Sequence, residues 1–239
     1  MANQLNVVLV HGAWADGSGW AKVIELLHEE GYSPVAVQNP LTSLADDVET
    51  VRRLVEAQDG PTLLVGHSYG GIVITEVAHK CPNVVGLVYV AAWVPEVGEN
   101  LGILASLGSP APGGAAVRPD KYGMLWIDRE LFAESFCQDV DKQEALVMAA
   151  AQHPTSGKCF EEKVTNAGWK NLPSWYQVSA EDRMIPPATE QFMAERIKPK
   201  AIISLPASHV SFISHPKEIT DLILKAANEV ESFIPVQTV

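Results

Sequence analysis

Cysteine is rare in this sequence. The three cysteines, Cys81, Cys137 and Cys159, are an odd number and their spacings match no metal-binding motif. Secreted domains that depend on disulfides are rich in cysteine, and structural zinc sites need ligands at short, regular spacings. The pattern fits buried, reduced thiols and indicates a cytoplasmic protein without a metal site.

Positive charge is also scarce. Only 17 lysines and arginines stand against 29 aspartates and glutamates, which gives a formal net charge of -12. Such a protein repels the phosphates of nucleic acids and anionic membranes unless its basic residues are clustered, and here they are scattered along the sequence. The sequence therefore argues against nucleic-acid and membrane partners.

Long hydrophobic runs are absent as well. No apolar segment reaches the roughly 20 residues that a membrane-spanning helix needs. Residues 1–4 lead directly into a strand-like segment and contain neither the basic region nor the cleavage site of a signal peptide. We therefore expect a protein of the cytoplasm.

The apolar residues that are present form short, regularly spaced segments. Hydrophobic residues make up 47% of the 239-residue chain, which is enough for one sizeable core. Segments typical of strands lie at Leu5–Val10, Pro34–Val37, Thr62–Val65, Val84–Val90, Trp175–Val178 and Ala201–Leu205. Helical spacing of apolar residues occurs at Trp20, Val23, Ile24 and Leu27, at Leu44, Val48, Val51 and Val55, and at Ile219, Leu222, Ile223 and Ala226. This alternation predicts an α/β fold with a doubly wound, mostly parallel sheet, whose ligands bind at the carboxyl ends of the strands.

The alternation of strands and helices stops in residues 94–170. This stretch begins with a segment rich in Gly, Pro and Ala, Gly98–Pro119, and continues with amphipathic segments. Loops of such length without a function are uncommon in compact domains. We therefore expect a single domain, in which residues 94–170 form a helical cap inserted into an α/β core of residues 1–93 and 171–239.

The clearest motif is Gly66-His67-Ser68-Tyr69-Gly70, which follows the expected strand Thr62–Val65 and precedes an apolar helical segment. G-x-S-x-G at a strand-to-helix turn is the nucleophile elbow. The sharp turn holds the serine in a strained backbone conformation, and the small residues on either side avoid clashes. Ser68 is therefore the predicted nucleophile.

A serine nucleophile needs a histidine base, which should follow a later strand. His209 lies just past the expected strand Ala201–Leu205. His67 adjoins the nucleophile and should point away from its hydroxyl, which indicates a structural role. Other histidines lie on predicted helices or in segments expected at the surface: His28, His79, His153 and His215.

The base in turn needs a carboxylate that fixes its tautomer. Asp182 follows the expected strand Trp175–Val178 and precedes Pro186-Pro187, where a helix should begin. Glu181 is the alternative, and either carboxylate could simply cap that helix. The interval from Asp182 to His209 accommodates one helix and one strand.

Acyl transfer also needs hydrogen-bond donors for the oxyanion. The backbone amide after the nucleophile, that of Tyr69, is one candidate. The second is the amide of Ala13 in the loop His11–Trp14, which follows the first expected strand. An ordinary glycine turn is the other interpretation of this loop.

With these motifs the chain resembles the α/β-hydrolase superfamily over essentially its whole length. It is most similar to the branch of plant methylesterases, hydroxynitrile lyases and small bacterial carboxylesterases. The resemblance rests on the loop His11–Trp14, the elbow, and the chain order of Ser68, Asp182 and His209. It implies a lidded apolar pocket above the nucleophile and no cofactor. The lyases of that branch carry threonine at the position of Gly12 and a cyanide-binding lysine at that of Val210, which disfavours lyase activity here.

The sequence predicts a carboxylic ester hydrolase that cleaves small hydrophobic esters through an acyl-enzyme. Alternatives are a hydrolase-fold ligand receptor with little turnover, a hydroxynitrile lyase, and a lactone, amide or carbon–carbon hydrolase, because a triad does not discriminate among acyl substrates. Activity should fall in acid, where a protonated His209 cannot act as base. Expected pocket residues are Trp14 and Val210 beside the chemistry and Trp126 in the cap.

Overall fold

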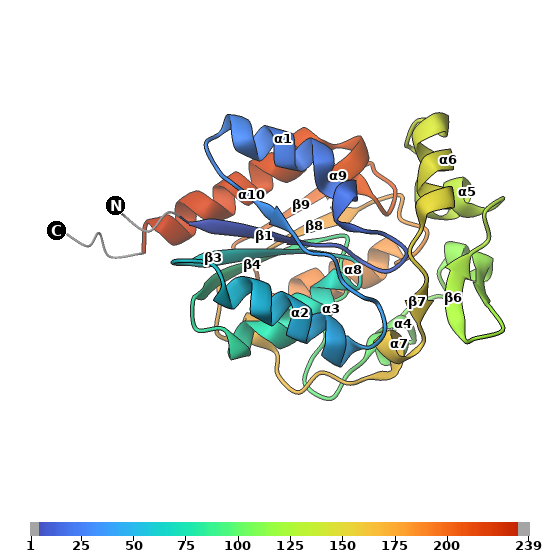
Figure 1. The fold of residues 1–239 in the computed structure, drawn as a ribbon, viewed down its shortest axis with the longest axis horizontal. Coiled ribbons are helices and arrows are strands. Elements are labelled where there is room, and N and C mark those ends of the chain that lie inside the picture. Colours follow the sequence, from blue (N-terminus) through green and yellow to red (C-terminus); the bar gives the residue numbers. More distant parts are fainter. Residues whose placement is uncertain (1–4, 234–239) are drawn as a thin grey trace.

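The computed structural model describes residues 5–233, and its centre is a sheet of six parallel strands (Figure 1). The strands lie in the order β2-β1-β3-β4-β8-β9. Their bounds are β1 Asn6–Val10, β2 Val35–Ala36, β3 Thr62–His67, β4 Val84–Val90, β8 Ser174–Ser179 and β9 Ala201–Leu205. Each expected strand segment overlaps one of these strands, so the prediction of a parallel α/β fold is confirmed.

Helices cover both faces of this sheet. On one face lie α1 (Ala21–Glu29) and α10 (Pro216–Glu231), and on the other lie α2 (Leu44–Glu56), α3 (Gly70–Val77) and α8 (Pro187–Ile197) (Figure 1). A short helix, α9 (Ser211–Ser214), precedes α10. Short 3-10 helices occupy Gly17–Trp20, Ala78–Lys80, Pro112–Ala116 and Gly168–Lys170.

Local sequence signals explain where the helices begin and which side they bury. The hydroxyl of Ser43 accepts a hydrogen bond from the backbone N–H of Asp46 at 3.1 Å and caps the start of α2. The predicted apolar stripe of α2 is buried along its whole length: Leu44, Val48, Val51 and Val55. Pro187 begins α8 at the position where the missing N–H of proline costs nothing.

The elbow region lies deep in the core. All six residues of β3 and all eight of α3 are buried. A strand between two neighbours of a parallel sheet has both faces covered by helices, which explains why its apolar residues are continuous rather than alternating. The turn between β3 and α3 is therefore held on all sides.

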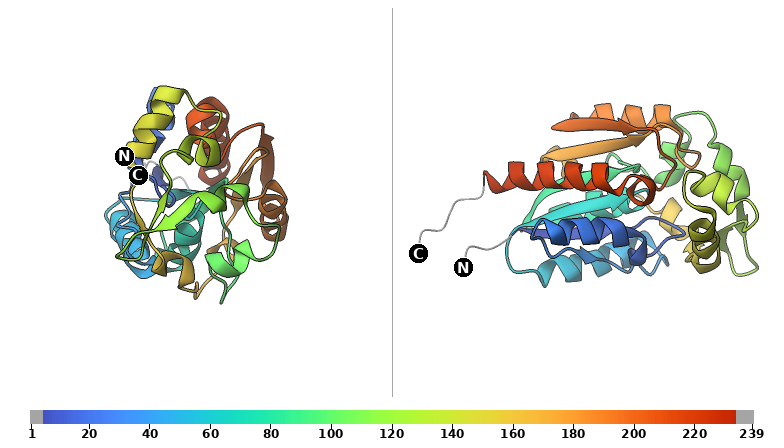
Figure 2. Two further views of the ribbon diagram at one scale, coloured as in Figure 1. Left: turned by 90° about the vertical axis from the view of Figure 1, so that its right-hand side faces the viewer. Right: turned by 90° about the horizontal axis from the view of Figure 1, so that it is seen from above.

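Most of residues 94–170 lies beyond the carboxyl ends of the strands (Figure 2). The last residues of this stretch return along the core, where the N–H of Thr165 donates to Glu76 of α3. The expected amphipathic segments form α5 (Phe132–Phe136) and α6 (Lys142–Ala151). Two further short helices, α4 (Leu101–Ala105) and α7 (Lys158–Glu161), were not predicted. Residues 94–170 also contain an antiparallel sheet that the sequence analysis did not predict: β5 (Val117–Pro119), β6 (Met124–Ile127) and β7 (Thr155–Ser156). These strands have two to four residues, too few to show a period of two in the sequence.

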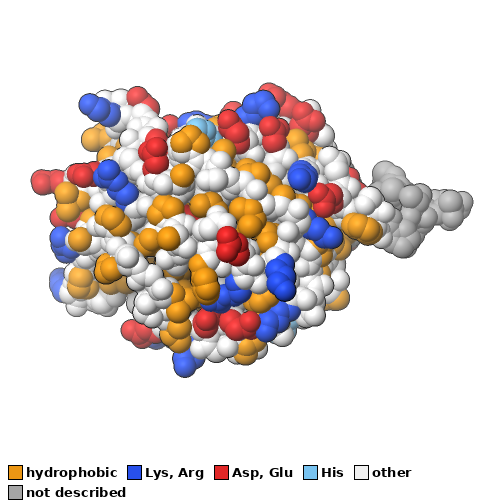
Figure 3. All heavy atoms as spheres, turned by 180° about the vertical axis from the view of Figure 1, so that it is seen from behind, with side chains coloured by type: hydrophobic (Ala, Val, Ile, Leu, Met, Phe, Trp, Pro, Cys, Tyr) orange, Lys and Arg blue, Asp and Glu red, His pale blue; other side chains and the backbone are white. Residues whose placement is uncertain are grey.

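In the described part of the chain, no helix combines the length and hydrophobicity needed to cross a membrane. On the face shown in Figure 3, lysine and arginine side chains lie among acidic ones. The three cysteines are buried and form no disulfide with one another.

Candidate active site

Ser68 lies in the turn between β3 and α3 and has a left-handed backbone conformation, with φ of +52°. Serine adopts this conformation at a cost, which is typical of functional turns. A Cβ atom at position 66 would lie 2.7 Å from the carbonyl oxygen of Gly70. One at position 70 would lie 2.5 Å from the carbonyl oxygen of Val10. Both glycines of the motif are therefore required by close backbone contacts.

Hydrogen bonds to the backbone of Ser68 hold this strained conformation. Its N–H donates to the carbonyl oxygens of Val90 and Ala91 at 3.3 and 3.2 Å. Its own carbonyl oxygen accepts from the N–H groups of Gly71 and Trp93 at 3.0 and 3.1 Å. The position of the serine is thus fixed by the end of β4 as well as by its own strand and helix.

His209 and Asp182 form a buried pair at the ends of β9 and β8. The Nδ1 atom of His209 lies 2.5 Å from Oδ2 of Asp182. The other carboxylate oxygen, Oδ1, accepts hydrogen bonds from the N–H groups of Met184 and Ile185 at 2.6 and 2.8 Å. Asp182 therefore caps the turn before α8 and holds the imidazole with its Nδ1–H toward the carboxylate, which leaves Nε2 as an acceptor. Glu181, the alternative acid, is exposed.

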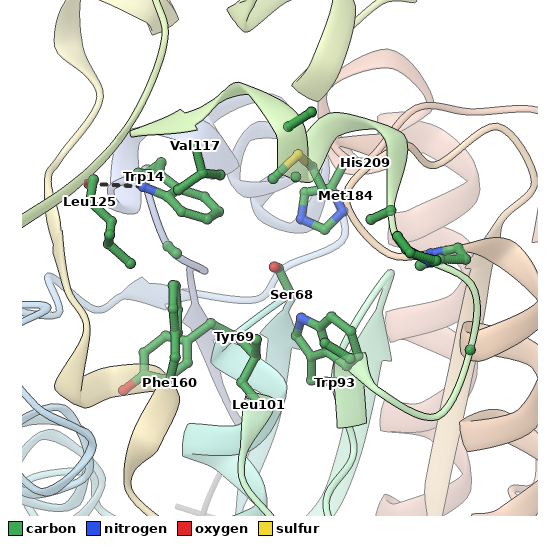
Figure 4. A pocket seen from close by; sticks show the side chains of 18 of the residues that line it. Trp14, Ser68, Tyr69, Trp93, Leu101, Val117, Leu125, Phe160, Met184 and His209 are labelled. Carbon is green, nitrogen blue, oxygen red and sulfur yellow. Dashed lines mark hydrogen bonds between the residues drawn. The ribbon is translucent and has the colours of Figure 1, made fainter. Parts of the chain in front are cut away.

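Ser68 and His209 both line one cavity of about 610 Å³ (Figure 4). The hydroxyl of Ser68 points into this cavity, and the ring of His209 lies beside it. The structure thus brings together Ser68, Asp182 and His209 from the carboxyl ends of three different strands, where the sequence analysis expected the chemistry.

The two expected oxyanion donors also belong to this cavity. Ala13 and Tyr69 line it, and neither backbone N–H donates to another residue of the described chain. A Cβ atom on Gly12 would lie 2.7 Å from the Cβ atom of Ser68, so the loop after β1 packs directly against the nucleophile. His11 braces this loop: its Nδ1–H donates to the carbonyl oxygen of Gly12 at 2.8 Å.

Burial keeps the two inner histidines of the site neutral. It lowers the pKa of His11 to about 4 and the pKa of His67 well below its usual value. Because a carbonyl oxygen only accepts, Nε2 of His67 carries the proton and donates to the carbonyl oxygen of His209 at 2.8 Å. His67 therefore positions the loop that carries His209, and its role is structural, as the sequence predicted.

Comparison with known proteins identifies the family of this chain. A family model described as the alpha/beta hydrolase family matches residues 7–222. The chain belongs to this family. Pyrethroid hydrolase of Sphingobium wenxiniae is 26% identical to it over 93% of this chain and 88% of the relative. Methylesterase 3 of Arabidopsis thaliana is 23% identical over 94% and 96% of the two chains.

The fold of this α/β-hydrolase matches solved structures of the family. A pyrethroid hydrolase from Sphingobium faniae superposes with a TM-score of 0.82 at 23% identity, covering 94% of this chain and 98% of that one. The likeness in structure supports the fold, and the relatives by sequence support a carboxylic ester hydrolase.

The wall of the cavity in this α/β-hydrolase is largely apolar. Its lining in the described chain contains no lysine, arginine, aspartate or glutamate. Large side chains of the wall include Trp14, Leu101, Val117, Leu125, Phe160 and Met184 (Figure 4). The hydroxyl of Tyr69 donates to Oδ2 of Asp47 at 2.8 Å. Because Asp47 does not line the cavity, this hydroxyl adds no polar group to the cavity wall.

Of the three residues that the sequence predicted for the pocket, only one lines the catalytic cavity. Trp14 lines the cavity, as predicted, and its ring N–H donates to the carbonyl oxygen of Leu125 at 3.0 Å. Val210 lines a smaller neighbouring cavity of about 100 Å³ instead. Trp126 lines neither, and its ring N–H donates to Asp120 at 3.2 Å. Successive side chains of a strand point to opposite sides, so Leu125 of β6 faces the cavity and Trp126 faces away.

A buried carboxyl group behind the site was missed by the sequence analysis. Glu190 of α8 is fully buried, and its Oε2 accepts a hydrogen bond from the N–H of Ser179 at 3.0 Å. Burial raises the pKa of Glu190 well above its usual value, and the nearby charge of Asp182 raises it further. Both effects favour the neutral acid form of Glu190.

Relative to the wild type, the Glu190→Gln variant should become more stable as the pH rises above the unfolded-state pKa of glutamate, about 4.3. A folded-state pKa above the unfolded value means that the wild type loses stability above the unfolded pKa, by up to about 1.4 kcal/mol per pH unit. The amide does not titrate. Urea unfolding at several pH values measures this difference. The control, Glu195→Gln, removes an exposed carboxyl group of the same helix. Parallel stability curves for Glu190→Gln and wild type would contradict the prediction.

Proposed function

We propose that this α/β-hydrolase cleaves small, hydrophobic, uncharged carboxylic esters through a covalent acyl-serine intermediate. The observation that carries the proposal is that Ser68 and His209 face one cavity while His209 is bonded to the buried Asp182 at 2.5 Å. This is the set of groups that activates a serine hydroxyl in other hydrolases.

In the proposed cycle, Nε2 of His209 takes the hydroxyl proton of Ser68 as the oxygen attacks the ester carbonyl. The amides of Ala13 and Tyr69 donate to the resulting oxyanion. Protonated His209 then gives its proton to the alcohol oxygen, and the alcohol leaves. A water molecule, deprotonated by the same imidazole, attacks the acyl-serine and releases the acid.

We also propose that residues 94–170 act as a cap that shapes the substrate site. The support is that four different elements of this stretch line the cavity, through Leu101, Val117, Leu125 and Phe160. All four are apolar, which favours hydrophobic acyl and alcohol groups. The three cysteine thiols are buried and form no disulfide, which supports a location in the reducing cytoplasm.

A matched pair of esters tests the proposed substrate class. The neutral 4-nitrophenyl butyrate should be hydrolysed with a kcat/KM at least about tenfold higher than the anionic 4-nitrophenyl hemisuccinate. The reason is that the cavity offers no cation to a buried carboxylate, and the overall negative charge slows its approach. Release of nitrophenolate is measured and corrected for the rate of each ester without enzyme, which for the hemisuccinate includes attack by its own carboxylate. Faster turnover of the anionic ester would refute the substrate class, and no turnover of any ester would favour a receptor.

The lyase alternative is not supported. The position that holds the cyanide-binding lysine in the similar lyases is Val210, which is fully buried and has no charge.

A further inference from the structure

One side chain in the wall of the catalytic cavity has a hydrogen-bond donor without an acceptor. Trp93 follows β4 and is only 5% exposed. Its indole nitrogen faces the cavity beside Ser68 (Figure 4). No residue in the described part of the chain accepts a hydrogen bond from this N–H. An indole N–H can only donate. The Trp93 side chain is almost fully buried, but its ring nitrogen is not sealed off from the cavity, so this donor is open to a molecule bound there.

The other five tryptophans, all within the described residues, differ from this one. Three of them donate the ring N–H to a carbonyl or carboxylate oxygen of the protein: Trp14, Trp126 and Trp169. The ring N–H groups of Trp20 and Trp175 have no partner either, but both side chains are fully buried and do not line the cavity. Among the tryptophans, Trp93 alone offers a free donor to a molecule in the cavity.

The backbone of Trp93 is fixed relative to the nucleophile. Its N–H donates to the carbonyl oxygen of Ser68 at 3.1 Å. A Cβ atom on Gly71 would lie 2.5 Å from the carbonyl oxygen of Trp93, so this loop is packed tightly on the first turn of α3. A donor held in this way loses little conformational freedom when it binds a substrate.

The reaction geometry indicates which part of an ester reaches Trp93. In the proposed cycle the alcohol oxygen leaves beside His209, and the carbonyl oxygen binds the amides of Ala13 and Tyr69. The acyl chain takes the remaining direction from the reacting carbon. Figure 4 shows Trp93 on the opposite side of the Ser68 hydroxyl from His209. The indole N–H therefore faces the acyl side.

We propose that Trp93 donates a hydrogen bond to a second oxygen on the acyl chain, near the scissile carbonyl. The preferred acyl groups then carry an ether, hydroxyl or carbonyl oxygen at this place and are otherwise apolar. This inference rests on the proposed ester hydrolysis and narrows its substrate class. A donor in the wall of an apolar cavity discriminates against analogues lacking the acceptor, because such an analogue displaces solvent from the donor and leaves it unpaired.

Isosteric ester pairs and one conservative variant test the assignment. The pairs are 4-nitrophenyl pentanoate with 4-nitrophenyl 3-methoxypropanoate and with 4-nitrophenyl ethoxyacetate, in which oxygen replaces one methylene of the acyl chain. After correction for hydroxide rates, wild type should favour at least one oxygen-containing ester by about tenfold in kcat/KM. This preference should disappear in Trp93→Phe, which keeps an aromatic ring and removes the donor.

Trp126→Phe is the matched control, because this ring lies outside the cavity and its N–H is already bonded to Asp120. It should keep the wild-type preference. An equal preference for the oxygen-containing acyl group in wild type and Trp93→Phe would overturn the assignment. A second pair, 2-methoxyethyl and butyl esters of one acid, places the oxygen in the alcohol part. A preference for that oxygen that depends on Trp93 would also overturn the assignment. If Trp93→Phe does not fold, the wild-type enzyme alone decides: a kcat/KM for the oxygen-containing ester no higher than that for pentanoate, in both pairs, overturns the assignment. Failure of the proposed function itself is distinct, since no ester would then be turned over.

Discussion

Ser68→Ala should lower kcat for 4-nitrophenyl butyrate by roughly 10⁴- to 10⁶-fold, because it removes the hydroxyl that forms the acyl-enzyme in the proposed cycle. The fold should persist. Alanine keeps the Cβ atom that already exists at this left-handed position, so the substitution adds no backbone strain, and the four backbone hydrogen bonds of the residue remain. Steady-state rates and thermal unfolding measure the two effects.

Covalent labelling separates loss of the nucleophile from general damage. A fluorophosphonate probe should label wild type and fail to label Ser68→Ala. The control variant Ser232→Ala changes an exposed serine at the end of α10 and should be labelled like wild type. Equal labelling of Ser68→Ala, or turnover within a factor of about ten of wild type, would show that another group is the nucleophile.

The sequence was sufficient for the sheet and for the elbow, for physical reasons. A central parallel strand such as β3 is buried throughout and carries a continuous apolar run, Leu63–Val65, which stands out against amphipathic helices such as α2. The glycines of the elbow are set by backbone contacts below 3 Å that tolerate no side chain. Because the fold requires glycine at these positions, they form a motif that can be recognised from the sequence alone.

The features that the sequence did not reveal depend on packing between distant segments. The small sheet of β5, β6 and β7 has no periodicity to detect, so the choice between Leu125 and Trp126 as a cavity residue could not be made. Glu190 could have faced solvent as well as the core, because α8 shows no strong apolar stripe to orient it. Trp93 did have a signal, since it follows the strand Val84–Val90 and must lie at the same edge of the sheet as Ser68.

Asp182→Asn should lower kcat by roughly 10³- to 10⁴-fold with only a small change in stability. The amide keeps an oxygen that can accept from the N–H groups of Met184 and Ile185. Its NH₂ group would then face Nδ1 of His209, which must act as acceptor. The imidazole proton moves to Nε2, and this nitrogen can no longer take the proton of Ser68.

Glu181→Gln is the matched control, because it removes a carboxylate from the adjacent position, where the side chain is exposed. It should leave kcat close to that of wild type. The reverse result, a large loss of kcat in Glu181→Gln and a small one in Asp182→Asn, would show that Glu181 and not Asp182 is the acid of the triad. A large loss in Asp182→Asn together with a collapsed melting temperature would point to its role as a cap. Intact stability with lost turnover is the result that only an orienting carboxylate explains.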